Sequence, residues 1–318
     1  MTGYIVNRLL TSMATISLLV IATFSLVRFL PGDVIDVITD GNTTVESRAQ
    51  LEELLGLDEP ALSAFGTYVL GILRADFGES LISGSPVLPE IRSRIVTTGE
   101  LALIALALST LVGIATGILA AVNRGRFLDY VIRSTVVAFL ATPNFWIATI
   151  VIVYGALWFN WAPPLRYEKL WENPIANLSQ VWLPALILGL SLAASLSRMT
   201  RTMMLEELRN DHIRTARSKG LGERSTILRH GLPNVLIPIL TLLGVQIAAL
   251  LGGTVILEQI FGIPGLGRYL IDAISRRDYP VVQGIVLVIG IGVVAINFVV
   301  DLLYTAVDPR LRLSGGRA

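Results

Sequence analysis

Apolar residues in this chain gather in long runs that carry almost no charge, and the charged residues gather between those runs. A helix needs about 20 such residues to cross a hydrocarbon core of ~30 Å. Six runs approach or exceed that length, namely residues 9–27, 101–123, 134–167 (interrupted only by Arg166), 180–197, 231–257 and 279–300. The pattern therefore predicts an all-α integral membrane protein with six transmembrane helices.

The ends of three runs need separate treatment. Residues 134–167 are too many for one span, so we expect 158–164 to leave the membrane. The shortest run contains Pro184 near its start, where the first turn of a helix tolerates proline. The first run follows Arg8 and is longer than the apolar core of ~7–15 residues in a signal peptide. We therefore expect a retained first helix that extends to residue 30.

These runs divide the chain into an N-terminus with its first helix (1–30), a polar segment (31–96), a five-helix core (97–310) and a short tail (311–318). Within the polar segment, apolar spacing and turn residues predict short helices at 47–57, 61–73 and 86–94, and a turn at 76–80. The segment is too short for a large core of its own. It is either a solvated loop or a docking surface on the outer face of the bundle.

Basic residues indicate the orientation, because cytoplasmic loops of membrane proteins are enriched in them. With six helices, Arg8, the loops 122–133 and 198–233, and the tail all lie on one side, and each is basic. The opposite side includes the acidic segment 31–96. We therefore expect both termini in the cytoplasm, in a multi-pass protein of the cell membrane.

Composition narrows the function. Charged residues make up 15% of the chain, against roughly 25% in soluble domains. The net charge is +1 and the basic residues are spread along one membrane face, which argues against nucleic acid as a partner. The chain has no cysteine, and a metal site at its two histidines, His212 and His230, would need further ligands close by, so we expect none.

Motifs for other mechanisms are missing. Neither lysine follows a glycine, so there is no phosphate-binding loop of the Gly-Lys-Ser/Thr kind. The tail sequence from Leu313 to Arg317 is similar to the signature peptide of ABC ATPases, but the chain ends before a helix could follow. No serine–histidine–aspartate set is evident, so we expect no enzyme activity in this chain.

Two other function classes stay open. A secondary transporter or channel would show charges within the membrane or inverted repeats, and neither is evident; the acidic residues lie near the ends of the runs. A membrane-anchored scaffold or sensor without transport is the second alternative.

The basic loop 198–233 holds the most specific pattern. Asp211 is expected to cap a short helix through Lys219, and Gly220 suits a left-handed C-terminal position. Ile213 and Ala216 share one face, which leaves the basic residues for polar contacts. The plainer alternative is an interfacial helix whose arginines bind lipid phosphates.

The sequence Arg214-Thr-Ala-x3-Gly220, followed by Leu232-Pro233, resembles the EAA loop of ABC importer permeases. Arg214, Thr215 and His230 depart from the usual Glu, Ala and Ile of that loop. This variant is similar to the dipeptide, oligopeptide and nickel branch of the family. Shorter matches in the order of that branch begin at Arg28, Leu55, Asp76, Thr142, Glu258, Arg277 and Asp301.

The resemblance implies a type I importer permease fold and one half of a permease heterodimer. It also implies a solute-binding protein that delivers peptides or a related small solute, and two ABC ATPase subunits that hold ATP and magnesium. This chain itself would hold no cofactor. The resemblance places the ATPase-coupling helix at Asp211, Ile213, Arg214, Thr215, Ala216, Arg217, Lys219, Gly220 and Leu221.

Two further sites are predicted from polar or bend-forming residues. Asn144 and Gln246 lie in the middle of spans and either line the translocation path or hydrogen-bond to neighbouring helices. Glu258, Pro264, Gly265 and Gly267 are expected to form a bend at the outer mouth, where gating and a packed turn are the alternatives. The identity of the solute does not follow from the sequence.

Overall fold

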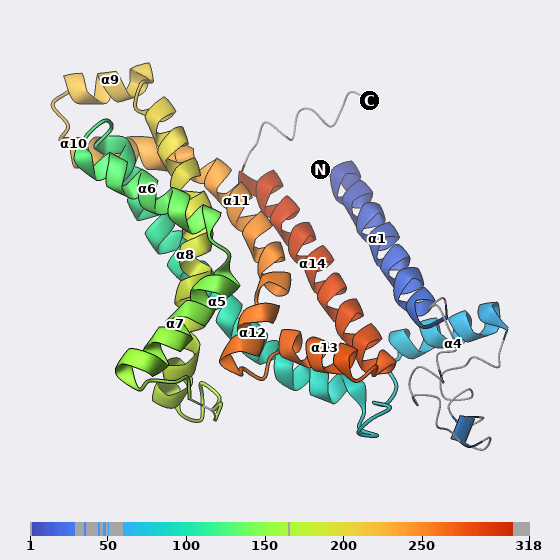
Figure 1. Ribbon diagram of the computed structural model, residues 1–318. Coiled ribbons are helices and arrows are strands. Elements are labelled where there is room, and N and C mark those ends of the chain that lie inside the picture. The colour runs from blue at the N-terminus through green and yellow to red at the C-terminus, as the bar shows by residue number, and fades with distance from the viewer. Residues whose placement is uncertain are drawn as a thin grey trace. The chain divides into compact units, whose positions relative to one another are not determined.

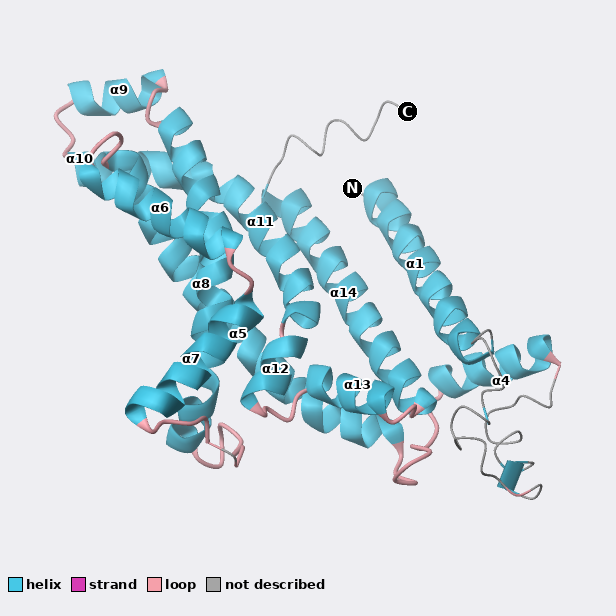
Figure 2. Cartoon of the chain, in the orientation of Figure 1, coloured by secondary structure: helices cyan, strands magenta, loops and turns pink. Residues whose placement is uncertain are grey.

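The protein is described from a computed structural model, which covers residues 2–28, 35, 44, 47–48, 50, 60–164 and 166–307. Within these ranges the regular elements are helices, joined by loops and turns (Figure 2). Most of the predicted helix at 47–57 lies outside the described residues, as do the matches at 29–33 and 55–59 and the tail 308–318. Figure 1 labels the elements along the chain.

The described residues form the following helices, given in chain order. They are α1 (Thr2–Arg28), α4 (Ala61–Leu73), α5 (Val87–Val122), α6 (Phe127–Ala141), α7 (Asn144–Phe159), α8 (Pro174–Glu207), α9 (Asp211–Ser218), α10 (Glu223–Ser225), the π-helix η1 (Thr226–Gly231), α11 (Leu232–Gly253), α12 (Val255–Phe261), α13 (Leu266–Ser275) and α14 (Tyr279–Val307). The predicted helix at 61–73 is confirmed in full.

Five stretches of the described chain are long and apolar enough to cross a membrane: Ile5–Ser25, Val87–Val122, Pro174–Glu207, Glu223–Leu250 and Tyr279–Leu302. A sixth candidate is the pair α6 and α7, which bend by 96° at a short break. The prediction of a multi-span helical membrane protein is therefore confirmed, with six spans where the bent pair counts as one.

The third run, predicted as one span, is divided by a sharp bend that the prediction did not include. Thr142 adopts an extended conformation (φ −102°, ψ 123°), and Pro143 precedes the first residue of α7. Proline has no N–H to continue the helical ladder, and it disfavours the α conformation at the residue before it. Helix α7 ends at Phe159, within the stretch 158–164 that was expected to leave the membrane, and Asn160 is left-handed (φ 48°).

Two helices are longer than predicted. The expected separate helix at 86–94 is the first part of α5, which has 36 residues and thus extends for about 54 Å. Helix α8 begins at Pro174, so Pro184 lies in its interior and not in its first turn. The side chain of Asn173 caps α8 by accepting a hydrogen bond from the Ala176 N–H at 3.2 Å.

The chain forms two compact units. The first comprises Thr97–Arg268 and the chain from Ile296 onward. In it, α5 and α8 cross closely, because a Cβ at Gly117 would lie 2.5 Å from the Thr200 Cβ and 2.7 Å from the Ser197 carbonyl oxygen. Small residues that allow such close approach are typical of helix pairs in membranes.

A buried ion pair joins two helices of the first unit. Asp129, which is 1% exposed, accepts hydrogen bonds from Arg201 Nε at 2.8 Å and Nη2 at 2.9 Å. Its second oxygen also accepts the Gly125 N–H at 3.0 Å. The paired, two-point geometry fixes the start of α6 against α8.

The second unit comprises Thr2–Val96 and Tyr269–Ala295. Helix α4 packs on α1 through Phe65 and Phe24, whose ring centroids lie 5.2 Å apart in an edge-to-face arrangement. Ser80 donates a hydrogen bond to the buried Asp278, which also accepts the Leu81 N–H at 3.2 Å. The predicted turn at 76–80 is therefore held against the start of α14.

Candidate functional site

Helix α9 is a short amphipathic helix at one end of the first unit, beside α10 and the end of α8 (Figure 1). Ile213 is fully buried and Ala216 is 6% exposed, and both belong to the face that packs on the chain itself. Arg214, Thr215 and Lys219 are exposed. One face therefore fixes α9 to its own unit, and the other presents charge to the surroundings.

The two ends of α9 partly follow the sequence-based expectation. Asn210, and not Asp211, occupies the N-cap position, and its side chain makes no capping bond to the α9 backbone. The helix ends at Ser218, with Lys219 as the C-cap. Gly220 has φ +80°, which confirms the predicted left-handed conformation.

The segment after α9 is ordered by an ion pair and a π-helix. Arg217 donates to both carboxylate oxygens of Glu223, at 2.6 and 3.1 Å, and this contact raises the pKa of the guanidinium. Leu221, which lies between Arg217 and Glu223 in the sequence, is 39% exposed. The π-helix η1 then includes His230 and leads directly into α11, with Pro233 in its first turn.

Gln246 makes contacts inside the helix bundle. Its Nε2 donates to the Leu192 carbonyl and to Ser195, both at 3.0 Å, and its Oε1 accepts from Ser109 at 3.2 Å. The side chain thus joins α5, α8 and α11, and the residue is 4% exposed. These contacts favour the interhelical alternative for Gln246 over a path-lining position.

Asn144 lies at the bend between α6 and α7. Its Oδ1 accepts a hydrogen bond from Ser191 on α8, and the residue is half-buried. The contact ties the bend to α8. Asn144 keeps partial access to its surroundings, so it remains a predicted path residue.

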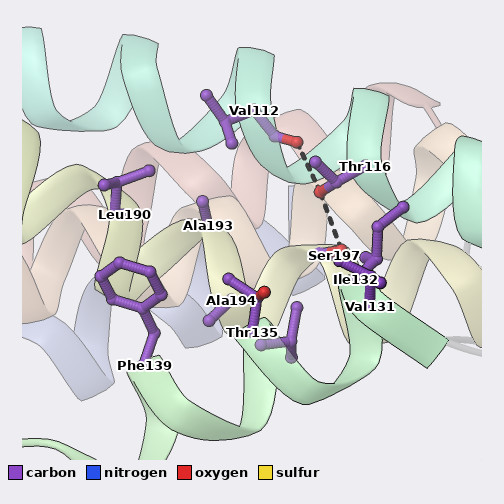
Figure 3. Close-up of a pocket in the computed structure, with 11 residues that line it drawn as sticks. Val112, Thr116, Val131, Ile132, Thr135, Phe139, Leu190, Ala193, Ala194 and Ser197 are labelled. Atoms are coloured by element: carbon purple, nitrogen blue, oxygen red, sulfur yellow. Dashed lines mark hydrogen bonds between the residues drawn. The ribbon is translucent and has the colours of Figure 1, made fainter. Parts of the chain in front are cut away.

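A cavity of about 140 Å³ lies between α5, α6 and α8 (Figure 3). Its walls are mainly aliphatic, with Phe139 at one side, and among its hydroxyl groups Thr116 donates to Ser197 at 2.8 Å. Ligand sites for small molecules usually measure ~300–1,000 Å³ and carry several polar groups. This cavity includes neither Asn144 nor Gln246 and has the character of a packing gap, not of a path for a polar solute.

The predicted outer mouth is a packed turn between α12 and α13. Glu258 is fully buried and accepts hydrogen bonds from Thr98 at 2.7 Å and from the Arg268 N–H at 3.0 Å. The Thr98 hydroxyl in turn accepts the Leu266 N–H at 2.8 Å. A Cβ at Gly265 would collide with the Glu258 carboxylate. Of the two alternatives, the structure favours the packed turn.

Nearby, Tyr167 in the loop before α8 donates to Glu100 at 2.9 Å. Burial raises the pKa of Tyr167 to about 12 and so favours the protonated hydroxyl, which is the form that donates. The sequence pattern had not indicated Thr98 as a partner of Glu258, Tyr167 as a partner of Glu100, or Arg201 as a partner of Asp129. These partners lie far from the acidic residues in sequence, and no local spacing connects them.

Residues 113–313 match the family described as "Binding-protein-dependent transport system inner membrane component". The chain belongs to this family. It is 38% identical over 312 residues to a putative peptide transport system permease protein of Brucella abortus, covering 98% of this chain and 99% of the relative. It is 36% identical, also over 98% and 99%, to the glutathione transport system permease protein GsiC of Salmonella choleraesuis.

Solved structures support the fold of this binding-protein-dependent permease. An inward-facing form of the MetNI methionine ABC transporter matches with a TM-score of 0.54 at 17% identity, covering 69% of this chain and 96% of that chain. An amino acid ABC transporter matches with a TM-score of 0.53, also at 17% identity and over 69% of this chain. The predicted importer-permease fold and membership of an inner-membrane transport system are confirmed.

Proposed function

We propose that α9 is the helix through which this permease is driven by an ABC ATPase. One observation carries the proposal: α9 buries Ile213 and Ala216 against its own chain while it exposes Arg214, Thr215 and Lys219. The helix is therefore fixed on one side and open on the other. A connection that transmits displacement needs both properties.

In the proposed cycle, α9 moves as a rigid helix and transmits its displacement to the spans. ATP binding draws the two ATPase subunits together, and the helices seated on them follow. Helix α9 lies in sequence between the spans α8 and α11, so its displacement moves both of them. The bundle then alternates between inward-open and outward-open forms around a cavity shared with a second permease.

The partner set follows from this role. The family description supports a binding protein as the donor of the solute. We propose in addition a second homologous permease, two ATPase subunits that hold ATP and magnesium, and both termini of this chain in the cytoplasm. Basic residues at 124, 126 and 133 and in the loop 198–233 support that orientation.

For the solute we propose short peptides, including glutathione. The support is the similarity over nearly the full chain to relatives named for peptide and glutathione transport. Uptake into proteoliposomes that contain the complete transporter tests this, with labelled dipeptide, glutathione and free methionine compared at equal concentration. Uptake of methionine alone would contradict the proposal.

The contact with the ATPase can be tested by cross-linking. The chain has no cysteine, so the variant Thr215→Cys carries a single thiol on the exposed face of α9. With single cysteines placed in the ATPase, we expect a cross-link that changes in yield when ATP is added. Ser83→Cys, exposed in the loop before α5, is the matched control and should give none.

The same experiment tests the lipid-binding alternative. An α9 that rests on lipid phosphates through Arg214 and Lys219 would give no cross-link from position 215 to the ATPase. A cross-link of equal yield from positions 83 and 215 would also contradict the proposal.

A further inference from the structure

Glu207 is the last residue of α8, and its carboxylate accepts hydrogen bonds from side chains that belong to α9 and α11 or to the cap of α9. Its Oε2 accepts from Asn210 Nδ2 at 2.7 Å, and its Oε1 accepts from His212 Nε2 at 2.9 Å and Asn234 Nδ2 at 2.6 Å. Asn210 is the N-cap of α9, His212 lies in its first turn, and Asn234 lies in the first turn of α11.

The position of the carboxylate has an electrostatic reason. Negative charge is unfavourable at a helix C-terminus and favourable at an N-terminus. Glu207 ends α8, but its oxygens are bound by side chains at the N-terminal end of α9, namely Asn210 and His212. Its side chain is only 11% exposed, so water screens these contacts less than it screens a surface pair.

The histidine contact fits the same arrangement. A carboxylate oxygen without a proton only accepts, so the Nε2 of His212 must carry the hydrogen. Asn210 and Asn234 each donate from an amide nitrogen. Three donors on one carboxylate leave little freedom for its orientation.

We propose that Glu207 is a positioning residue that sets the angle and register of α9 relative to α8 and α11. This inference rests on the proposed function of α9. The buried face of α9 consists of Ile213 and Ala216, and apolar contacts of this kind are not directional. Without the three hydrogen bonds, α9 can shift on that face, and part of the movement imposed by the ATPase is lost before it reaches the spans.

Glu207→Gln tests this role in the complete transporter. The amide presents one acceptor and a donor to three existing donors. Loss of about one charge-assisted hydrogen bond corresponds to roughly a tenfold change in an equilibrium. We therefore expect uptake per ATP hydrolysed to fall by about tenfold, while recovery of the ATPase with the permease is unchanged.

The matched control is Glu206→Gln, which makes the same charge change at the neighbouring residue. Glu206 is exposed, and its side chain makes no hydrogen bond to the part of the chain that the structure describes. We expect its uptake per ATP to match that of the parent protein. Equal ratios in the two variants would overturn the inference.

A reversal of donor and acceptor gives a second test. Asn234→Asp places a second carboxylate against Glu207, and we expect it to lower the ratio. The double variant Glu207→Gln with Asn234→Asp restores a hydrogen bond of opposite polarity, and we expect most of the ratio to return. A double variant no better than either single variant would overturn the inference.

A role in folding alone predicts something different. It would lower the amount of assembled transporter and leave uptake per ATP unchanged, and this result too overturns the inference. Should Glu207→Gln fail to accumulate, His212→Phe and Asn234→Leu each remove one donor at an exposed position. An unchanged ratio in both would overturn it.

The outcomes also separate this inference from the function on which it rests. If Thr215→Cys does not cross-link to the ATPase, the proposed function of α9 fails. If the cross-link forms and Glu207→Gln keeps the parent ratio, only the positioning role fails.

Discussion

Three buried acidic residues in the described part of this protein hold chain segments together. Asp129 is 1% exposed, Glu258 is fully buried and Asp278 is 4% exposed. Each accepts at least one backbone N–H and at least one side-chain donor. A buried carboxylate without such partners would be costly. These three carboxylates therefore stabilise the fold, and the proposed role of Glu207 is of the same kind.

At Gly220 the backbone alone determines what a substitution costs. Its φ is +80°, and nothing lies within 4 Å of the position that a Cβ would occupy. Gly220→Val should therefore cost about 1 kcal/mol or more through left-handed strain, without any steric clash. We expect a shift at the end of α9 and reduced uptake, measured in proteoliposomes, with normal membrane insertion.

Gly222→Val is the control for this strain. Gly222 is equally open but has φ −63°, which any residue adopts. The Gly222→Val variant should therefore take up solute at the rate of the parent protein. Similar losses in both variants would show that the strain at Gly220 is not the cause.

At the scale of elements, local patterns predicted what depends on local sequence. The helix Ala61–Leu73 and the left-handed Gly220 are both confirmed. The 96° bend between α6 and α7 was missed, although Pro143 was a visible signal for it. The contacts of Glu207 with Asn234 and of Ser80 with Asp278 join residues 27 and 198 positions apart. Such pairs form only through tertiary packing, so periodicity and turn chemistry do not encode them.

The crossing of α5 and α8 depends on glycine in the same way. Gly117→Ala would place a methyl group 2.5 Å from the Thr200 Cβ and 2.7 Å from a backbone oxygen, so the helices must separate. Overpacking of this kind typically costs about 1–3 kcal/mol. We expect a lower midpoint of thermal unfolding in detergent.

Gly99→Ala on the same helix is the control for this clash. No atom lies within 4 Å of its Cβ position, and alanine favours a helix by roughly 0.5–1 kcal/mol over glycine. Its midpoint should stay constant or rise. A loss equal to that of Gly117→Ala would contradict the close-packing explanation.

At the scale of the whole molecule, the proposed function divides the work of transport among several subunits. Neither lysine follows a glycine, so the chain has no phosphate-binding loop of the Gly-Lys-Ser/Thr kind. The cavity between α5, α6 and α8 has about 140 Å³ and mainly aliphatic walls. This cavity does not suit a polar solute, and in the proposed function the solute passes through a larger one at the interface with the second permease. In the proposed function, the energy, the selection of the solute and half of the path come from other subunits.

This division requires that α9 face the cytoplasm, and the orientation is open to a direct test. Arg126→Cys lies in the basic loop between α5 and α6, and Ser83→Cys lies in the loop before α5; both positions are exposed. Basic loops remain cytoplasmic, since their charge opposes translocation. In intact cells an impermeant maleimide should label position 83 and label position 126 only after permeabilisation. Because the parent chain contains no cysteine, unlabelled parent protein reports the background. Labelling of position 126 in intact cells would place α9 outside, where no ATPase has access to it, and would contradict the proposed drive.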